Sequence, residues 1–516
     1  MYSKIISGSL LGVKAILINV EVDVSSGLPL FAVVGCPGSE VKESKERVWA
    51  AFKNANLPMP VSRITVNLSP ADLHKEGTAF DLPIAIGIME SSGQLPSGST
   101  DNRLFLGELG LNGEIRPVRG VLPIVTEAKK RGIKECIIPA ENAREGAIVP
   151  GITIRAASDL FSVMEYLNDP VKNDLPTVKS DVKNESSPDT EIIDHEVDFS
   201  DVNGQEAAKR AAVISAAGFH SLLMTGPPGV GKSLIAKRIP TIMPPLSLEE
   251  SLEVTSIFSV AGKLPPGSTL MTKRGFESPH HTITLPALIG GGQNPHPGAV
   301  SLAHRSVLFL DELTEFDRKS IDSLRQPLED HAVHISRSKY NISYPADFLL
   351  VCAMNPCPCG YYPDRNKCRC SENAIQRYLG RVSGPILDRI DLCVQMSPVT
   401  LSDISSPAKG VSSKTMREQV IAAREAQKER YEKTPYRFNS EIKGSDIEKY
   451  CHLDDKEKSF IGDLFEKLGL SVRSYHRILC VSRTVADLDG SEKILKKHIL
   501  EAASYRPNSE YWGTGF

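Results

Sequence analysis

One octapeptide constrains the fold of this chain more than any other segment; it consists of Gly226, Pro227, Pro228, Gly229, Val230, Gly231, Lys232 and Ser233. It follows the apolar run 221–225 and precedes the helix-like run 234–238. Glycines in such a loop let successive backbone N–H groups point at phosphate oxygens beside a helix N-terminus. Lys232 is then placed to reach the outer phosphates, and the Ser233 hydroxyl to ligate Mg²⁺. An ordinary glycine turn does not require Lys-Ser at this point. The segment therefore predicts an α/β fold that binds ATP or another nucleoside triphosphate.

The composition is that of a soluble globular protein. The chain has 516 residues, 41% of them hydrophobic and 24% charged, which suits about three domains. A net charge of −3 argues against a surface that coats nucleic acid along its whole extent, although local basic patches remain compatible with it. No apolar run reaches the ~18 residues of a membrane span. The run 5–13 ends at Lys14 without a cleavage site. We expect a cytoplasmic protein with no membrane partner.

Two polar strand ends extend the predicted nucleotide site. The buried run 307–310 ends in Asp311 and Glu312, and the run 348–354 ends in Asn355. Ligands gather at the carboxyl ends of strands in open α/β sheets. We expect Asp311 to hold Mg²⁺ through water, Glu312 to polarise the attacking water and Asn355 to orient on the γ-phosphate. Helix-capping acids and a turn-forming asparagine are the alternative roles.

Four cysteines crowd into one short segment: Cys357, Cys359, Cys368 and Cys370. They form two C-x-C arms, and tetrahedral zinc takes four such thiolates. The predicted Zn²⁺ is structural; the alternative is four reduced thiols in a loop. The other six cysteines are scattered and are expected to be ordinary buried thiols: Cys36, Cys136, Cys352, Cys393, Cys451 and Cys480.

The N-terminal part forms an α/β domain of its own. Apolar periodicity predicts strands at 15–22, 30–34 and 64–68 and helices at 40–54, 82–90 and 121–131. The segment 169–198 is rich in Asp, Glu, Lys, Ser and Pro. Such a segment buries too little apolar surface to offset its chain entropy, so we expect a flexible linker there.

Three motifs in this domain, at 75–82, 113–120 and 132–139, resemble the Lon protease domain, whose fold is shared with a ribosomal small-subunit protein. Lon-type proteases use a Ser–Lys dyad. Ala79 stands at the serine position and Leu122 at the lysine position. The resemblance therefore implies an inactive domain, and a protease would need another Ser–Lys pair.

Two segments near the octapeptide resemble parts of AAA+ ATPases. The run 201–205 (DVNGQ) resembles the adenine-side segment, which implies that Val202 and Gly204 line the base. The run 387–391 (LDRID) resembles the L-x-R-[FI]-D signature of the branch that contains magnesium chelatase and replicative helicase subunits. That resemblance implies that Arg389 reaches the nucleotide of a neighbouring subunit as an arginine finger. A surface ion pair with Asp388 or Asp391 is the alternative.

The helical run from Ser471 resembles the second sensor of the same branch, which implies a role for Arg473, with Arg477 as the fallback. The inserts 276–304 and 332–344 match the helix-two insert and pre-sensor hairpin of this branch. Arg337, Lys339 and Tyr340 in that hairpin suit phosphate tracking and base stacking, although most basic hairpins are merely solvated. His280 and His281 are expected to be a structural pair, with metal binding as the alternative.

Nearly the whole chain resembles the YifB/ComM magnesium chelatase-like family. The resemblance implies an inactive Lon-like domain (1–168), a linker (169–198), an AAA+ core (199–400) and a C-terminal helical lid (401–508). It further implies ATP and Mg²⁺ as ligands, a hexameric ring, and helicase activity that promotes DNA branch migration in recombination and natural transformation. The alternative is a chelatase-like or chaperone-like ATPase that remodels a protein partner.

Overall fold

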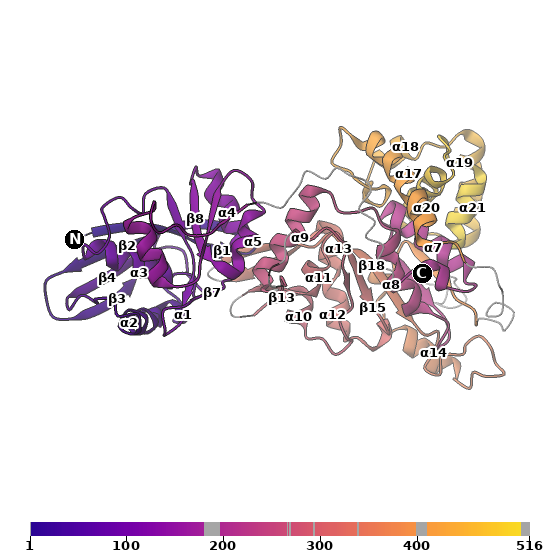
Figure 1. Cartoon of the computed structure of the whole chain (residues 1–516). Coiled ribbons are helices and arrows are strands. Elements are labelled where there is room, and N and C mark those ends of the chain that lie inside the picture. Colours follow the sequence, from indigo (N-terminus) through magenta and orange to yellow (C-terminus); the bar gives the residue numbers. More distant parts are fainter. Residues whose placement is uncertain are drawn as a thin grey trace.

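The computed structural model describes residues 2–179, 197–265, 267, 270–292, 295–337, 340–398 and 410–506. An N-terminal domain lies beside an ATPase-like core that carries the C-terminal helices (Figure 1). Both parts are mixed α/β, as expected from the sequence. Within this described part of the chain, no helix combines the length and the hydrophobicity that crossing a bilayer requires.

The described residues of the N-terminal domain form an eight-stranded sheet in the order β10-β9-β8-β5-β1-β2-β4-β3. Its strands are β1 (Tyr2–Leu11), β2 (Lys14–Ser25), β3 (Leu30–Val34), β4 (Arg63–Ser69), β5 (Arg103–Phe105), β8 (Glu135–Pro139), β9 (Thr153–Ala157) and β10 (Thr177–Val178), and a separate small pair joins β6 (Glu108–Leu109) to β7 (Ile115–Arg116). The helices are α1 (Ser39–Lys42), α2 (Ser44–Asn54), α3 (Asp81–Ser91), α4 (Val121–Lys130), α5 (Ala143–Ala147) and α6 (Leu160–Asn168). The apolar helix α3 packs on β1 and β2, where a Cβ at Gly87 would lie 2.5 Å from Val22.

The N-terminal sheet continues into the segment that the sequence assigned to a linker. β10 pairs antiparallel with β9, with Thr177 opposite Arg155, and Leu175 is buried. Arg155 also forms an ion pair with Asp174 at 2.6 Å. The two residues of β10 are held in place by their pairing with β9 and not by their own apolar content. The composition of the segment therefore does not predict this strand. The remainder of the expected linker, 180–196, lies outside the described residues.

The ATPase-like core is built on a parallel five-stranded sheet in the order β12-β15-β18-β11-β19. The strands are β11 (Leu222–Thr225), β12 (Phe276–Glu277), β15 (Val307–Leu310), β18 (Leu349–Met354) and β19 (Leu392–Gln395). The first residues of the expected insert 276–304 are therefore an edge strand of the core. Because all five strands run the same way, their carboxyl ends meet at one edge of the sheet.

Helices and a hairpin surround this sheet. They are α7 (Glu206–Gly218), α8 (Lys232–Ile242), α9 (Leu248–Ala261), α10 (Leu285–Ile289), α11 (Ala299–Leu302), α12 (Arg318–Ser323), α13 (Arg325–Asp330), α14 (Glu372–Leu379) and α15 (Gly384–Leu387), with the strand pairs β13 (Gly290–Gly291) and β14 (His296–Pro297), and β16 (Ala332–Arg337) and β17 (Tyr340–Pro345). The second pair is the hairpin expected at 332–344. Lys339 lies outside the described residues.

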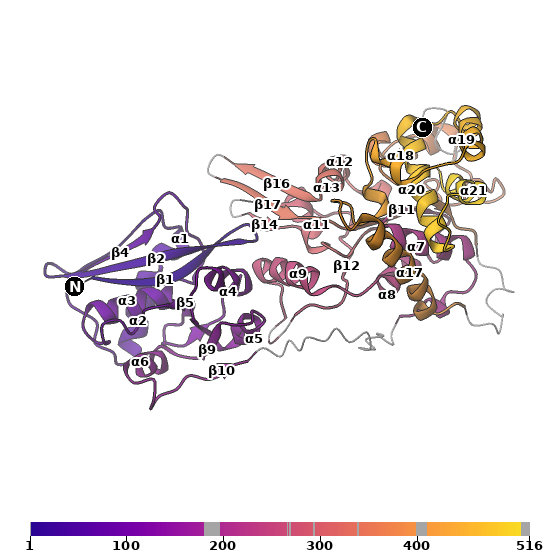
Figure 2. The same ribbon diagram turned by 90° about the horizontal axis from the view of Figure 1, so that it is seen from above.

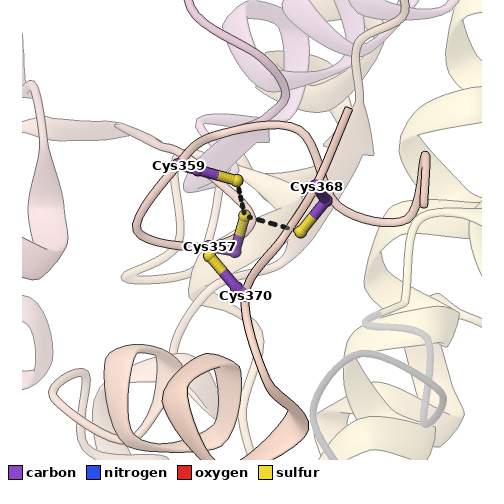
Figure 3. Close-up of side chains that lie close together, drawn as sticks. All are labelled: Cys357, Cys359, Cys368 and Cys370. Atoms are coloured by element: carbon purple, nitrogen blue, oxygen red, sulfur yellow. Dashed lines mark hydrogen bonds between the residues drawn. The ribbon is translucent and has the colours of Figure 1, made fainter. Parts of the chain in front are cut away.

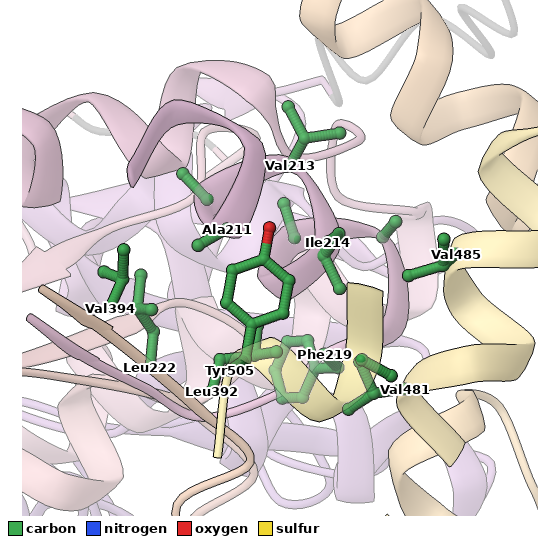
Figure 4. Packing of buried hydrophobic residues seen from close by; sticks show 14 of the residues in the cluster. Ala211, Val213, Ile214, Phe219, Leu222, Leu392, Val394, Val481, Val485 and Tyr505 are labelled. Carbon is green, nitrogen blue, oxygen red and sulfur yellow. The ribbon is translucent and has the colours of Figure 1, made fainter. Parts of the chain in front are cut away.

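The C-terminal segment is helical and packs on α7. Its helices are α17 (Ser413–Tyr431), α18 (Asp446–Tyr450), α19 (Asp455–Leu468), α20 (Val472–Leu488) and α21 (Lys496–Ser504). Phe219, Leu392, Val481 and Tyr505 share one core between the sheet and these helices (Figure 4). The Cys393 backbone N–H also donates to the Tyr505 carbonyl at 2.7 Å.

The N-terminal domain lies against the core, and two of its contacts involve α9 and the hairpin (Figure 2). Helix α4 packs on α9, where Ser259 Oγ donates to Glu145 Oε1. The β1–β2 turn lies against the hairpin, because a Cβ at Gly12 would come within 2.7 Å of Ile342 in β17. These contacts tie the domain to α9 and to the hairpin.

Candidate nucleotide-binding site

The glycine loop connects β11 to α8 at the carboxyl edge of the core sheet. Gly231 precedes α8 with φ +93°, a left-handed conformation that favours glycine. Gly226 leaves no room for a side chain, since a Cβ there would lie 2.6 Å from the Met396 carbonyl. The loop is thereby held against the chain that follows β19.

Lys232 folds back into this loop. Its ammonium donates to the carbonyls of Gly226 at 2.7 Å and Pro227 at 2.9 Å, and to Asn355 Oδ1 at 3.1 Å. Burial lowers the pKa of Lys232, while Asp311 and Glu312 act to raise it. The structure thus brings together the lysine and the asparagine that the sequence assigned to one site.

Ser233 and Asp311 also meet there. Ser233 Oγ donates to Asp311 Oδ2 at 2.7 Å, and Asp311 Oδ1 accepts from the Glu312 backbone N–H at 2.9 Å. A hydroxyl and a carboxylate at one point are the oxygen donors that Mg²⁺ prefers. The donor set therefore fits the predicted Mg²⁺.

Glu312 has a contact that the sequence did not predict. It follows β15 with φ +51°, and its side chain is 57% exposed. His281 Nδ1 lies 3.5 Å from Glu312 Oε2. The rings of His280 and His281 lie 4.1 Å apart, so they form a pair, but His281 also faces the candidate catalytic acid. No local sequence pattern predicts this contact, because His281 lies in the insert 276–304 and Glu312 lies in the motif that follows β15.

The segment before α7 is tied to the loop. Val202 is buried, and Gly204 has φ +65°. Gln205 Nε2 donates to the carbonyls of Val230 at 3.3 Å and Ser397 at 2.7 Å. The candidate adenine-side residues are therefore held next to the phosphate loop.

Arg389 lies at the opposite edge of the sheet. It precedes β19, and β19 runs parallel to β11 with Leu392 beside Leu222. Arg389 donates to Glu329 and to the Pro385 carbonyl, so its ion-pair partner is Glu329 and not Asp388 or Asp391. Arg389 lies at the amino-terminal edge of the sheet, and the phosphate loop begins at the carboxyl edge. The four residues of the strand between the two edges span about 13 Å.

Arg473 approaches the same carboxylate, with Nη2 3.4 Å from Glu329 Oε1 and a side chain that is 42% exposed. The fallback residue Arg477 instead forms an ion pair with Asp391. Burial, with help from Arg506, lowers the pKa of Arg477 to about 10. Arg389, Arg473 and Arg477 line one cavity of about 480 Å³. Arg473 is exposed and shares Glu329 with Arg389, whereas Arg477 pairs with Asp391. These contacts favour Arg473 over Arg477 as the arginine that acts together with Arg389.

The four clustered cysteines converge after β18 (Figure 3). Their sulfur atoms all lie within 4.8 Å of one another, with Cys357 Sγ 3.4 Å from Cys359 and 3.7 Å from Cys368. A hydrogen bond from the Tyr361 backbone helps to lower the pKa of Cys359 to about 6. Four such sulfurs fit a tetrahedral zinc ion. The cluster also adjoins the phosphate loop, since a Cβ at Gly360 would lie 2.6 Å from Pro228.

One expectation about the remaining thiols is wrong, because Cys36 is exposed. Cys393 is partly exposed as a residue, but burial raises the pKa of its thiol to about 12, as expected for a buried thiol. Cys36 occupies a turn that follows β3, whereas an isolated free cysteine is usually buried. Cys136, Cys352, Cys451 and Cys480 are buried as expected.

The Lon-like positions hold apolar side chains. Leu122 is fully buried, and Ala79 packs against the same cluster. The Leu122 backbone N–H donates to Glu145 Oε1 at 2.8 Å, the oxygen that also accepts from Ser259 of α9. Leu122, which stands at the position of the Lon lysine, thus lies at the contact with the ATPase-like core.

The chain is similar to known families and proteins along most of its length. Family models match along the chain: "Magnesium chelatase, subunit ChlI" at 198–404, its C-terminal part at 410–506, and "Subunit ChlI of Mg-chelatase" at 20–142. The chain is 44% identical to competence protein ComM of Haemophilus influenzae over 96% of each chain. It is 41% identical to the protein YifB of Salmonella typhimurium over 96% of this chain and 95% of that one. A shorter match, 30% identical over 25% of this chain and 23% of the other, is to Lon protease 2 of Bacillus subtilis.

Proposed function

The chain belongs to the magnesium chelatase-like AAA+ ATPase family that includes ComM and YifB, and from that premise we propose that it is an ATP-driven ring motor that promotes DNA branch migration. The observation that carries the proposal is the separation of two groups of side chains. Lys232, Ser233, Asp311 and Asn355 meet at one edge of the sheet. Arg389 and Arg473 share Glu329 at the other edge.

Each side chain at the carboxyl edge has a distinct task. Lys232 neutralises the outer phosphates, and Asn355 orients beside them. Ser233 and Asp311 hold Mg²⁺, which when bound offsets phosphate charge. Glu312 accepts a hydrogen bond from the attacking water and thereby orients it. Val202 and Gly204 flank the base, and helices α17–α21 act as a lid.

The arginines act on a neighbouring subunit. A guanidinium at the opposite edge of the sheet cannot stabilise charge at its own phosphate loop, but in a ring it faces the loop of the next protomer. A hexamer is the ring size of this proposal. Hydrolysis is then coupled to assembly, since each site is incomplete without its neighbour.

DNA is the proposed substrate. The support comes from the relative ComM, which is named a competence protein, and from the hairpin β16–β17, whose sequence includes Arg337 and Tyr340. The test is ATPase activity and binding with four-way and forked DNA, at low and high salt. Stimulation by branched DNA supports the proposal. A hydrolysis rate indifferent to every DNA, with no binding, would overturn it.

Remodelling of a protein partner is the second candidate. Its support is the docking of the N-terminal domain on α9 and on β17 at Ile342, which gives a protein-contacting domain access to the motor. Under this alternative, a protein bound to the N-terminal domain stimulates hydrolysis and DNA does not.

The cysteine cluster is proposed to hold one structural Zn²⁺. The support is its four convergent sulfurs, and the contact between Gly360 and Pro228 gives the metal a role in holding the phosphate loop. A cytoplasmic location, where thiols stay reduced, belongs to the same proposal.

A further inference from the structure

A second group of reactive side chains lies in the N-terminal domain, at the turn between β3 and α1. Cys36 Sγ lies 3.7 Å from His74 Nδ1. His74 Nε2 in turn lies 3.4 Å from Glu76 Oε1. A nucleophile, a base and a group that orients the base are the three parts of an activated nucleophile. The nucleotide site uses none of them.

The thiol is open to solvent. All ten cysteines fall within the described residues, and of these Cys36 alone is exposed. Its φ of +58° is unusual for a residue with a side chain. The turn is fixed by two backbone hydrogen bonds, from Gly38 N–H to the Lys75 carbonyl at 2.8 Å and from Lys75 N–H to the Cys36 carbonyl at 3.2 Å. The segment that carries His74 is therefore held beside the thiol by the backbone.

The surrounding charges suit proton transfer from the thiol. Glu76 beside Nε2 favours the tautomer with its proton on Nε2, which leaves the Nδ1 lone pair facing Cys36. Burial raises the pKa of Glu76, and His74 and His296 oppose that rise. Lys75 is buried nearby; burial lowers its pKa, and the charge of Cys36 opposes this. Its ammonium donates to the Gly35 carbonyl at 3.0 Å, which puts a positive charge next to the turn.

We propose that Cys36 is a nucleophilic thiol that exchanges with small-molecule disulfides. His74 Nδ1 takes the thiol proton, and the Cys36 sulfur attacks one sulfur of the disulfide R–S–S–R. The R–S–S–R bond breaks as the new S–S bond forms, and the leaving thiolate takes the proton from His74. The products are Cys36–S–S–R and RSH. The disulfide is the co-reactant, so no further oxidant is needed.

The test is the rate at which the full chain reacts with dithiodipyridine, a neutral disulfide whose released thiopyridone absorbs light. The wild type is expected to show one fast phase of one thiol per chain, which Cys36→Ser removes. His74→Gln slows this phase at least tenfold, and Glu76→Gln slows it by a smaller factor. The control His334→Gln, an exposed histidine on β16, leaves the rate unchanged.

Two results would overturn the proposal. One is a fast phase that persists in Cys36→Ser, and the other is His74→Gln reacting at the wild-type rate. Thermal unfolding of each variant checks that it is folded. Peptide mapping of the wild-type mixed disulfide must place the label on Cys36, which distinguishes this thiol from the cysteine cluster.

Discussion

Ser233 and Asp311 are hydrogen bonded, Oγ to Oδ2 at 2.7 Å, across 78 positions of sequence. Ser233 lies in the first turn of α8, after the glycine loop, and Asp311 directly follows β15. β11 and β15 are not neighbours, because β18 lies between them. The pair therefore exists only because three parallel strands bring their carboxyl ends to the same edge.

Replacing Lys232 should abolish tight nucleotide binding. Its ammonium is the positive group inside the loop, with Asn355 Oδ1 3.1 Å away. A lost charge-assisted hydrogen bond costs about 1.5–3 kcal/mol, so Lys232→Ala should weaken ATP binding roughly ten- to hundredfold, measured by calorimetry. Lys237→Ala on the exposed face of α8 is the matched control. Equal losses in the two variants would contradict the assignment.

Glu312 and His281 should affect turnover without affecting binding. Glu312→Gln is expected to bind ATP normally and to stop hydrolysis. His281→Ala removes the contact at 3.5 Å; an exposed pair is worth up to about 1 kcal/mol, which lowers kcat by up to about fivefold. His280→Ala is the control, since His280 Nδ1 contacts Thr282 at 2.8 Å. A parallel loss of binding in Glu312→Gln would sink its proposed role.

Mixing variants should reveal whether Arg389 acts across an interface. Arg389→Ala alone is expected to lose about 10³-fold in hydrolysis rate while keeping its own phosphate loop. Added Lys232→Ala subunits supply intact Arg389 and should restore part of the activity. The double variant Lys232→Ala, Arg389→Ala should restore none. If no mixture recovers activity although mixed rings form, Arg389 acts within its own protomer or only stabilises the fold through Glu329.

Removing the metal should loosen the phosphate loop. Purified protein is expected to carry about one zinc per chain, as four thiolates require, and Cys357→Ser should carry almost none. Because Gly360 packs on Pro228, the zinc-free variant should also bind ATP more weakly. Cys136→Ser in β8 is the control. Zinc absent from the wild type would leave the cluster as reduced thiols.

Acid should destabilise the core through His220. Burial, with the charge of Arg477, lowers the pKa of His220 to about 3, so the ring is neutral and its 3.5 Å contact with Asp391 is not an ion pair. The folded pKa lies below the unfolded value of about 6.5. The stability is therefore present above pH 6.5 and is lost as pH falls toward 3, by about 2 kcal/mol between pH 7 and 5.

Urea unfolding at pH 7 and pH 5 measures this loss. His220→Gln should show a smaller drop between the two pH values than the wild type. Thr484→Val removes the 2.7 Å hydrogen bond to His220 together with those to Asn439 and the Cys480 carbonyl. It leaves the His220 ring in place and should keep the wild-type pH dependence. Identical drops in wild type and His220→Gln would refute the assignment.

Local patterns were sufficient where one segment carries the whole signal. The strands that Asp311 and Asn355 directly follow lie where their apolar runs predicted, and the hairpin at 332–344 is present in the backbone. The apolar run 5–13 did not predict β1, because apolar residues near a chain start are also typical of a leader segment; the buried residues of β1 nevertheless alternate along much of the strand. α9 was also missed, although Ser247 and Glu250 form a capping box before it.

The sequence by itself determined the chemistry of the nucleotide site, because glycine, lysine, serine and strand-end acids must occur in fixed local order to bind phosphate and Mg²⁺. Only the tertiary structure decided which distant groups face one another. The meeting of His281 with Glu312, of Arg389 and Arg473 at Glu329, and of Cys36 with His74 depends on how separate elements pack. Packing depends on the apolar surface buried over the whole core. The local sequence around each of these residues therefore does not predict which distant residue it will contact.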